Sequence, residues 1–158
     1  MQAFLQRFLR AAHVATVVEY KYLEQLTRYI LELSLLDITM LAFRPSTIAA
    51  AVLLLARILL AHHDRVRGPA AQHVVWTRTM EYYAFHEASA LEPCARKLHK
   101  TLLSARTRGS KVTAICAKYL QAKRGEVARL HFIKELPANA FERFASFPVP
   151  LEYLKHMQ

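Results

Sequence analysis

The chain has 158 residues, of which 54% are hydrophobic and 22% charged, with 3 glycines and 2 cysteines. A chain of this length folds as one domain with its own core, and so few glycines exclude the phosphate-binding loops that need several close backbone approaches. The formal charge of +10 is concentrated in residues 91–134, which hold 11 basic and 2 acidic side chains. This concentration predicts attraction to an anionic partner but no particular fold.

Helical periodicity describes the first third of the chain. A short leading helix is predicted by the apolar set Phe4, Leu5, Phe8, Leu9 and Ala12. An amphipathic helix over residues 20–36 is predicted by the spacing of Leu23, Leu26, Ile30 and Leu33. Pro45 keeps the residue before it out of the helical region, so the chain turns there and Ser46 is expected to cap the next helix.

The next predicted helix, residues 47–61, is apolar on every side except at Arg57. A helix that is hydrophobic all round belongs in the centre of a bundle. Its small residues Ala49, Ala50 and Ala51 allow neighbouring helices to approach closely. A polar connection over residues 62–73 follows.

The second half of the chain predicts three further helices. Trp76, Met80 and Tyr83 recur at helical spacing and predict a short one. Ser89 and Glu92 have capping-box spacing and predict the start of a helix that runs to about residue 105, with Pro93 in its first turns. Its inward residues are expected to be Leu91, Cys94, Leu98 and Leu102. A last helix, residues 112 to about 125, is predicted by Val112, Ile115, Cys116, Tyr119 and Leu120.

The expected fold is therefore all-α. It comprises a short leading helix and a five-helix bundle around a central hydrophobic helix, in a domain over residues 1–130. The remaining residues, 131–158, hold prolines and phenylalanines and are expected to form an irregular tail packed on the bundle.

No residues predict catalysis, a metal site, a cofactor or a small-molecule ligand. The histidines do not form helical ligand pairs, and the cysteines lie on apolar helix faces where thiols are usually core residues. No apolar run is long enough to span a bilayer, and the two cysteines are expected to be reduced. We expect a protein of the nucleus or cytoplasm that is neither secreted nor bound to membranes.

Two clusters leave alternatives open. The aromatic group Trp76, Tyr82, Tyr83 and Phe85 has helical spacing, which favours the core over base stacking. The basic group is expected to form one exposed positive surface rather than scattered ion pairs, and serves either solubility or an anionic partner. It consists of Arg96, Lys97, Lys100, Arg106, Arg108 and Lys111.

Four blocks of sequence resemble the C-terminal cyclin fold of A- and B-type mitotic cyclins. Residues 29–51 are similar to the family pattern YLxELxLLDxxMxxFxPSxIAAA, and Trp76-Thr77 with Tyr82-Tyr83 is similar to WTxxLxxYT. Leu91-Glu92-Pro93 followed by Leu98 resembles LxPxxxxL, and Lys118-Tyr119 with Lys123 resembles KYxxxK. The matched residues of greatest weight, which the resemblance implies are structural, are Tyr29, Glu32, Leu33, Asp37, Pro45, Ser46, Ile48, Ala49, Ala50, Trp76, Pro93, Lys118 and Tyr119.

The resemblance implies a non-catalytic regulatory module. Members of this family carry two such folds in tandem, and the first fold holds the helix that grips the cyclin-dependent kinase. That first fold is not among these residues, so kinase binding and activation are expected only of a complete form. The alternative is a stand-alone helical adaptor that binds nucleic acid through residues 91–134.

Overall fold

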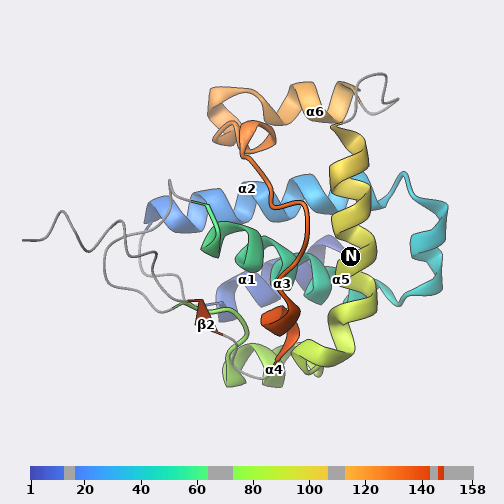
Figure 1. Ribbon diagram of the computed structural model, residues 1–158, viewed down its shortest axis with the longest axis vertical. Helices are drawn as coiled ribbons and strands as arrows, with labels where there is room; N and C mark the ends of the chain where they lie inside the picture. The colour runs from blue at the N-terminus through green and yellow to red at the C-terminus, as the bar shows by residue number, and fades with distance from the viewer. Residues whose placement is uncertain (13–16, 64–72, 107–112, 143–145, 148–158) are drawn as a thin grey trace, which may run out of the picture.

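The structure, a computed structural model, describes residues 1–12, 17–63, 73–106, 113–142 and 146–147 (Figure 1). Its α-helices are α1 (Gln2–Ala11), α2 (Val17–Ser34), α3 (Pro45–Ala61), α4 (Arg78–Ala84), α5 (Ala88–Ala105) and α6 (Thr113–Tyr119). Short 3-10 turns are η1 (Ile38–Ala42), η2 (Ala122–Arg124), η3 (Val127–Arg129) and η4 (Ala138–Phe141). The expected all-α bundle with a short leading helix is confirmed.

Helix α3 forms the centre of the bundle, as its composition predicts. Helices α1, α2 and α5 all pack against it, and Figure 1 shows it enclosed between them. The side chains of Ala49, Ala50 and Ala51 have no exposed surface. Small side chains at these positions let the surrounding helices approach the α3 backbone.

Arg57 is the charged residue of this central helix, and its guanidinium binds backbone oxygens. Its Nε donates to the carbonyl oxygen of Val75 at 2.9 Å, and one terminal nitrogen donates to that of Ala12 at 3.0 Å. A half-buried charge is stabilised when it is hydrogen-bonded in this way. Arg57 thereby ties the end of α1 and the segment before α4 to α3.

The periodic residues predicted to face inward do so in α2 and α5. The buried set in α2 includes Leu23, Leu26, Ile30 and Leu33, and the buried set in α5 includes Leu91, Cys94, Leu98 and Leu102. Pro93 lies inside α5, where a proline removes one backbone hydrogen bond near the helix start.

Both predicted N-caps are wrong. Helix α3 begins at Pro45, with Arg44 at the cap position, because the fixed φ of proline suits the first helical residue. Ser46 therefore lies inside the helix. Helix α5 begins one residue before Ser89, and Glu92 binds Arg96 one turn ahead instead of the cap. Burial of Ala88 against the core accounts for the earlier start.

The last predicted helix is shorter than its sequence pattern. Helix α6 ends at Tyr119, and Leu120 is 39% exposed. The chain then turns back through η2 and η3 so that Val127, which is fully buried, packs near α2 and α6. Gly125 takes the left-handed conformation, φ 67°, that this reversal requires.

The expected aromatic core cluster is wrong for three of its four members. Trp76 is buried but precedes α4, which begins at Arg78 because Thr77 caps it by accepting a hydrogen bond from the amide of Met80. Tyr82, Tyr83 and Phe85 are 71%, 39% and 78% exposed. Helix α4 is only two turns long, so Met80 and Ala84 supply its buried face.

The tail contacts the bundle where the structure describes it. Leu136 and Phe141 are buried, and η4 packs against α5. Ser146–Phe147 (β2) pairs antiparallel with His73–Val74 (β1), a two-residue ladder that no alternating pattern predicts. The other tail aromatic of this region, Phe144, lies outside the described residues.

Candidate interaction site

Two motif blocks that are far apart in the sequence meet between α2 and α6. Tyr29 and Tyr119 stack in a tilted arrangement with ring centroids 5.1 Å apart. Oε1 of Glu32 accepts hydrogen bonds from the Tyr119 hydroxyl at 2.8 Å and from the Lys118 ammonium at 2.7 Å. The Tyr29 hydroxyl shares a hydrogen bond with the thiol of Cys116 at 3.3 Å. We name Tyr29, Glu32, Lys118 and Tyr119 the α2–α6 cluster.

Burial shifts the acidity of the two tyrosines in this cluster. Desolvation raises the pKa of the Tyr29 hydroxyl, and its hydrogen bond with Cys116 raises it further. Desolvation likewise raises the pKa of Tyr119, followed by the effect of the Glu32 carboxylate. Both phenols therefore stay protonated at neutral pH, so the Tyr119 hydroxyl serves Glu32 as a donor.

Asp37 joins the turn after α2 to α5. Its Oδ1 accepts hydrogen bonds from the amide of Thr39 at 3.0 Å and from the Thr39 hydroxyl, and its Oδ2 accepts one from Thr101 at 2.9 Å. The bond from Thr39 is the main cause of a lowered pKa for this carboxyl group. The aspartate is therefore charged and held in place at neutral pH.

The remaining motif residues also make contacts inside the fold. The indole nitrogen of Trp76 donates to the carbonyl oxygen of His86 at 3.1 Å, and the imidazole of His86 shares a hydrogen bond with Thr47 in the first turn of α3. Ile48, Ala49 and Ala50 are buried in α3. These contacts connect helices to one another and arrange no group for chemistry.

Three of the four described basic residues of the predicted positive surface have individual partners. Arg96 forms an ion pair with Glu92 at 2.7 Å and lies over the ring of Phe141. Lys97 donates to the carbonyl oxygen of Thr39, and Arg106 donates to that of Leu130. The expectation that ion pairs would be lacking is wrong for Arg96, because the i, i+4 spacing brings Glu92 to it.

These residues also spread around α5 rather than forming one flat face. Lys97 faces η1, whereas Arg96 and Arg106 face η4 and the segment that precedes it. Lys100 is exposed between the two sides. Arg108 and Lys111 lie outside the described residues. Nothing in this arrangement supports the nucleic-acid alternative.

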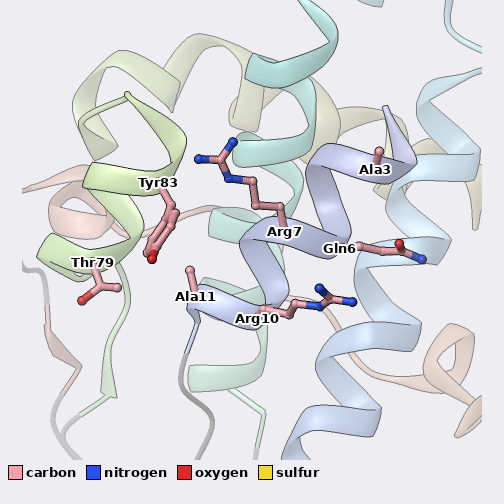
Figure 2. Close-up of a pocket in the computed structure, with 7 residues that line it drawn as sticks. All are labelled: Ala3, Gln6, Arg7, Arg10, Ala11, Thr79 and Tyr83. Atoms are coloured by element: carbon pink, nitrogen blue, oxygen red, sulfur yellow. The ribbon is translucent and has the colours of Figure 1, made fainter.

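A groove of about 450 Å³ between α1 and α4 is shown in Figure 2. The guanidinium of Arg7 lies over the ring of Tyr83, 5.6 Å from its centroid. Arg10 extends in another direction, on the side of Gln6 (Figure 2). Since the two guanidinium groups do not converge, the groove is no cradle for an anion.

Sequence reasoning missed an exposed aliphatic segment that follows α2 and continues into η1. Leu35, Leu36, Ile38 and Leu41 are 66%, 63%, 76% and 79% exposed. The sequence pattern predicts the end of an amphipathic helix and a turn for this run of apolar residues. Leu35 lies four residues after the buried Leu31, and Leu36 lies three after the buried Leu33, so helical spacing gave no sign that they are exposed.

The described side chains of Cys94 and His99 have structural roles. Burial raises the pKa of the Cys94 thiol to about 12, so this thiol is protonated and unreactive at neutral pH. Nε2 of the buried His99 donates to the carbonyl oxygen of Ile133 at 2.9 Å. The described residues hold no group of three or more metal-ligating side chains. Among them there is also no helix long and apolar enough to cross a membrane.

A family model and several known proteins that are similar to this chain all point to the cyclins. The family model "Cyclin, C-terminal domain" matches residues 2–132. Cyclin-A1-4 of Oryza sativa subsp. japonica is 34% identical over 146 residues, which are 92% of this chain and 38% of that protein. Cyclin-A1-1 of Arabidopsis thaliana is 35% identical over 140 residues, 89% of this chain and 28% of that protein. Cyclin-A2-1 of Arabidopsis thaliana is 37% identical over 129 residues, which are 82% of this chain and 27% of that protein. The chain thus spans well under half the length of these relatives.

Proposed function

The chain belongs to the cyclins, and from this premise we propose that it is a non-catalytic regulatory module, the second fold of a mitotic-type cyclin. Joined to a first cyclin fold, it would bind and activate a cyclin-dependent kinase in cell-cycle control. The observation that carries the proposal is the match of residues 2–132 to the C-terminal cyclin domain, together with A-type cyclins among its relatives.

The geometry favours a structural role for the motif residues of this fold over direct contact with the kinase. The α2–α6 cluster, Asp37 and Trp76 all bind other groups of the same fold. Side chains used in this way hold helices together and are not presented to a partner. This fold accordingly serves as a rigid domain against which a first cyclin fold packs.

Domain limits and location follow from the same proposal. Residues 1–130 form the fold itself, and residues 131–158 form a tail of which Leu136 and Phe141 pack on the bundle. A cyclin acts on its kinase in the nucleus or the cytoplasm, and the free thiols of Cys94 and Cys116 suit those reducing compartments.

A binding experiment with a chimera tests the proposal. The first fold of an A-type cyclin is fused ahead of residues 1–158, and the purified chimera is mixed with a monomeric cyclin-dependent kinase and analysed by size-exclusion chromatography. We expect the chimera to co-elute with the kinase, and the chain alone to elute separately. Co-elution of the chain alone, or separate elution of a chimera that has full helical circular dichroism, would contradict the proposal.

A further inference from the structure

A groove of about 550 Å³ lies between η1 and α5. Leu36 and Ile38 line one side of it, and Lys97, Lys100 and Thr101 line the other, with Asp37 between them. In Figure 1 the segment that contains η1, drawn in cyan, projects from the bundle beside α2 and α5. We name this feature the η1 groove.

The apolar side of the η1 groove faces solvent. Leu36 and Ile38 are 63% and 76% exposed, and Leu35 and Leu41 beside them are 66% and 79% exposed. Single exposed aliphatic residues are ordinary, but four lie within seven consecutive residues here, and two of them, Leu36 and Ile38, form an apolar patch along the groove. Such a patch next to a groove is typical of a surface that a partner covers.

The basic side of the groove has one ammonium group without a bound counterion. Lys97 donates to the carbonyl oxygen of Thr39 and lies near the ring of Phe43. Within the described part of the chain, the Lys100 ammonium makes no hydrogen bond or ion pair. Asp37 supplies one negative charge, but its two oxygens already accept hydrogen bonds from Thr39 and Thr101. The groove is therefore net positive and attracts carboxylates.

The groove is also held in a fixed shape. Asp37 links η1 to α5 through Thr101, and Lys97 links α5 back to η1 through Thr39. The apolar and basic sides are thus joined by hydrogen bonds in both directions. A preformed surface binds a partner at a lower cost in conformational entropy than a loop that must first become ordered.

We propose that the η1 groove binds a short acidic peptide segment of a partner protein. Aliphatic or aromatic side chains of that segment cover Leu36 and Ile38, while its carboxylates pair with Lys97 and Lys100. This inference goes beyond the proposed function, because it assigns a partner-binding surface to the second fold itself and does not depend on kinase activation.

Other occupants fit the groove less well. Nucleic acid binds through many phosphate contacts and stacked rings, whereas the side opposite the lysines offers aliphatic side chains. A second copy of this chain would bring another formal charge of +10 to a positive surface. An acidic segment with bulky apolar residues satisfies both sides at once.

Selection from a phage library of random peptides of about 15 residues, on the immobilised full chain, tests the inference. We expect the selected sequences to combine Asp or Glu with Leu, Ile or Phe. Synthetic copies of them should bind the full chain at about 0.15 M salt. Ile38→Ser and Lys100→Glu should each weaken that binding by about fivefold or more.

Matched variants place the effect in the groove. Leu41→Ser changes an equally exposed aliphatic residue that does not line the groove, and Lys123→Glu changes an exposed lysine in η2. Both should alter the affinity by less than about twofold. The inference is overturned if no peptide is selected, or if the selected peptides lack acidic residues. It is also overturned if they bind Ile38→Ser as well as they bind wild type, or if duplex DNA competes for the groove at this salt concentration. Co-elution of the chimera with the kinase is independent of all these outcomes.

Discussion

The hydroxyl of Tyr119 donates a hydrogen bond to Glu32 over 2.8 Å, although 87 residues separate the two in the chain. The same carboxylate oxygen also accepts from Lys118 at 2.7 Å. One side chain of α2 thus holds two consecutive residues of α6. Because Tyr119 is fully buried, its hydroxyl has no water to replace a lost partner.

Replacing Glu32 should therefore destabilise the fold. Glu32→Ala leaves the Tyr119 hydroxyl buried without an acceptor, and we expect the free energy of unfolding to fall by about 1–3 kcal/mol in urea denaturation. Glu92→Ala is the control, because it removes a carboxylate from an exposed i, i+4 ion pair and should cost less than about 0.5 kcal/mol. Equal losses in the two variants would contradict the role given to Glu32.

The close packing around α3 makes a second prediction. Ala50 has no exposed surface, so Ala50→Leu forces a larger side chain between helices and should cost about 1–3 kcal/mol. The same change at Ala90, which is exposed on α5, should stay within about 0.5 kcal/mol of wild type. A thermal midpoint of Ala50→Leu within about one degree of wild type would show that α3 is not tightly enclosed.

His99 predicts how stability depends on pH. Burial lowers the pKa of His99 in the folded protein, whereas the unfolded chain has the ordinary pKa of about 6.5 and so binds more protons. The stabilising effect of the neutral imidazole is complete above that pH and is lost as the pH falls through the folded pKa.

The His99→Gln variant provides the measurement. Between about pH 7.5 and 5.5, wild type should lose more free energy of unfolding than His99→Gln does. His131→Gln, at an exposed position, should follow the wild-type curve. Parallel curves for wild type and His99→Gln would contradict the prediction.

The basic residues of α5 predict weak attraction to nucleic acid. We expect the chain to bind duplex DNA only through charge, so that the affinity falls steeply with added salt. Arg96→Glu combined with Lys100→Glu should lower both the affinity and the salt slope, as measured by fluorescence anisotropy. Binding that persists at about 0.15 M salt, or that the double reversal leaves unchanged, would contradict a weak interaction through charge alone.

Periodicity was enough to predict the helices that line the core. The spacing of Leu91, Leu98 and Leu102 predicts their burial because one face of a long helix must meet the core. Composition alone placed α3 at the centre. Periodicity and composition both report how apolar residues are distributed along the chain. That distribution is closely tied to which residues the core buries.

Helix ends could not be predicted in the same way. Ser89 and Glu92 satisfy a capping pattern, yet burial of Ala88 extends α5 past it. Leu120 continues the helical pattern after Tyr119, yet the packing of Val127 ends the helix earlier. Tertiary contacts decided both cases, and local sequence carries no information about them.

The residues of the α2–α6 cluster were identified by resemblance, but their mutual contacts were not. A motif match names Tyr29 and Lys118 separately, and nothing in the spacing says that their helices touch. The η1 groove escaped sequence reasoning for another reason. Leu36 and Ile38 are apolar, and exposure of an apolar side chain cannot be read from its type alone.

The central claim, that this chain is the second fold of a kinase-activating cyclin, is tested most directly by a phosphorylation assay. A monomeric cyclin-dependent kinase is titrated with the chimera of an A-type first fold and residues 1–158, with the chain alone, and with the first fold alone, and phosphate transfer to a standard substrate is measured. We predict saturable activation by the chimera and none by the chain alone. Substantial phosphorylation with the chain alone, or a folded chimera that activates no better than the first fold alone, would contradict the claim.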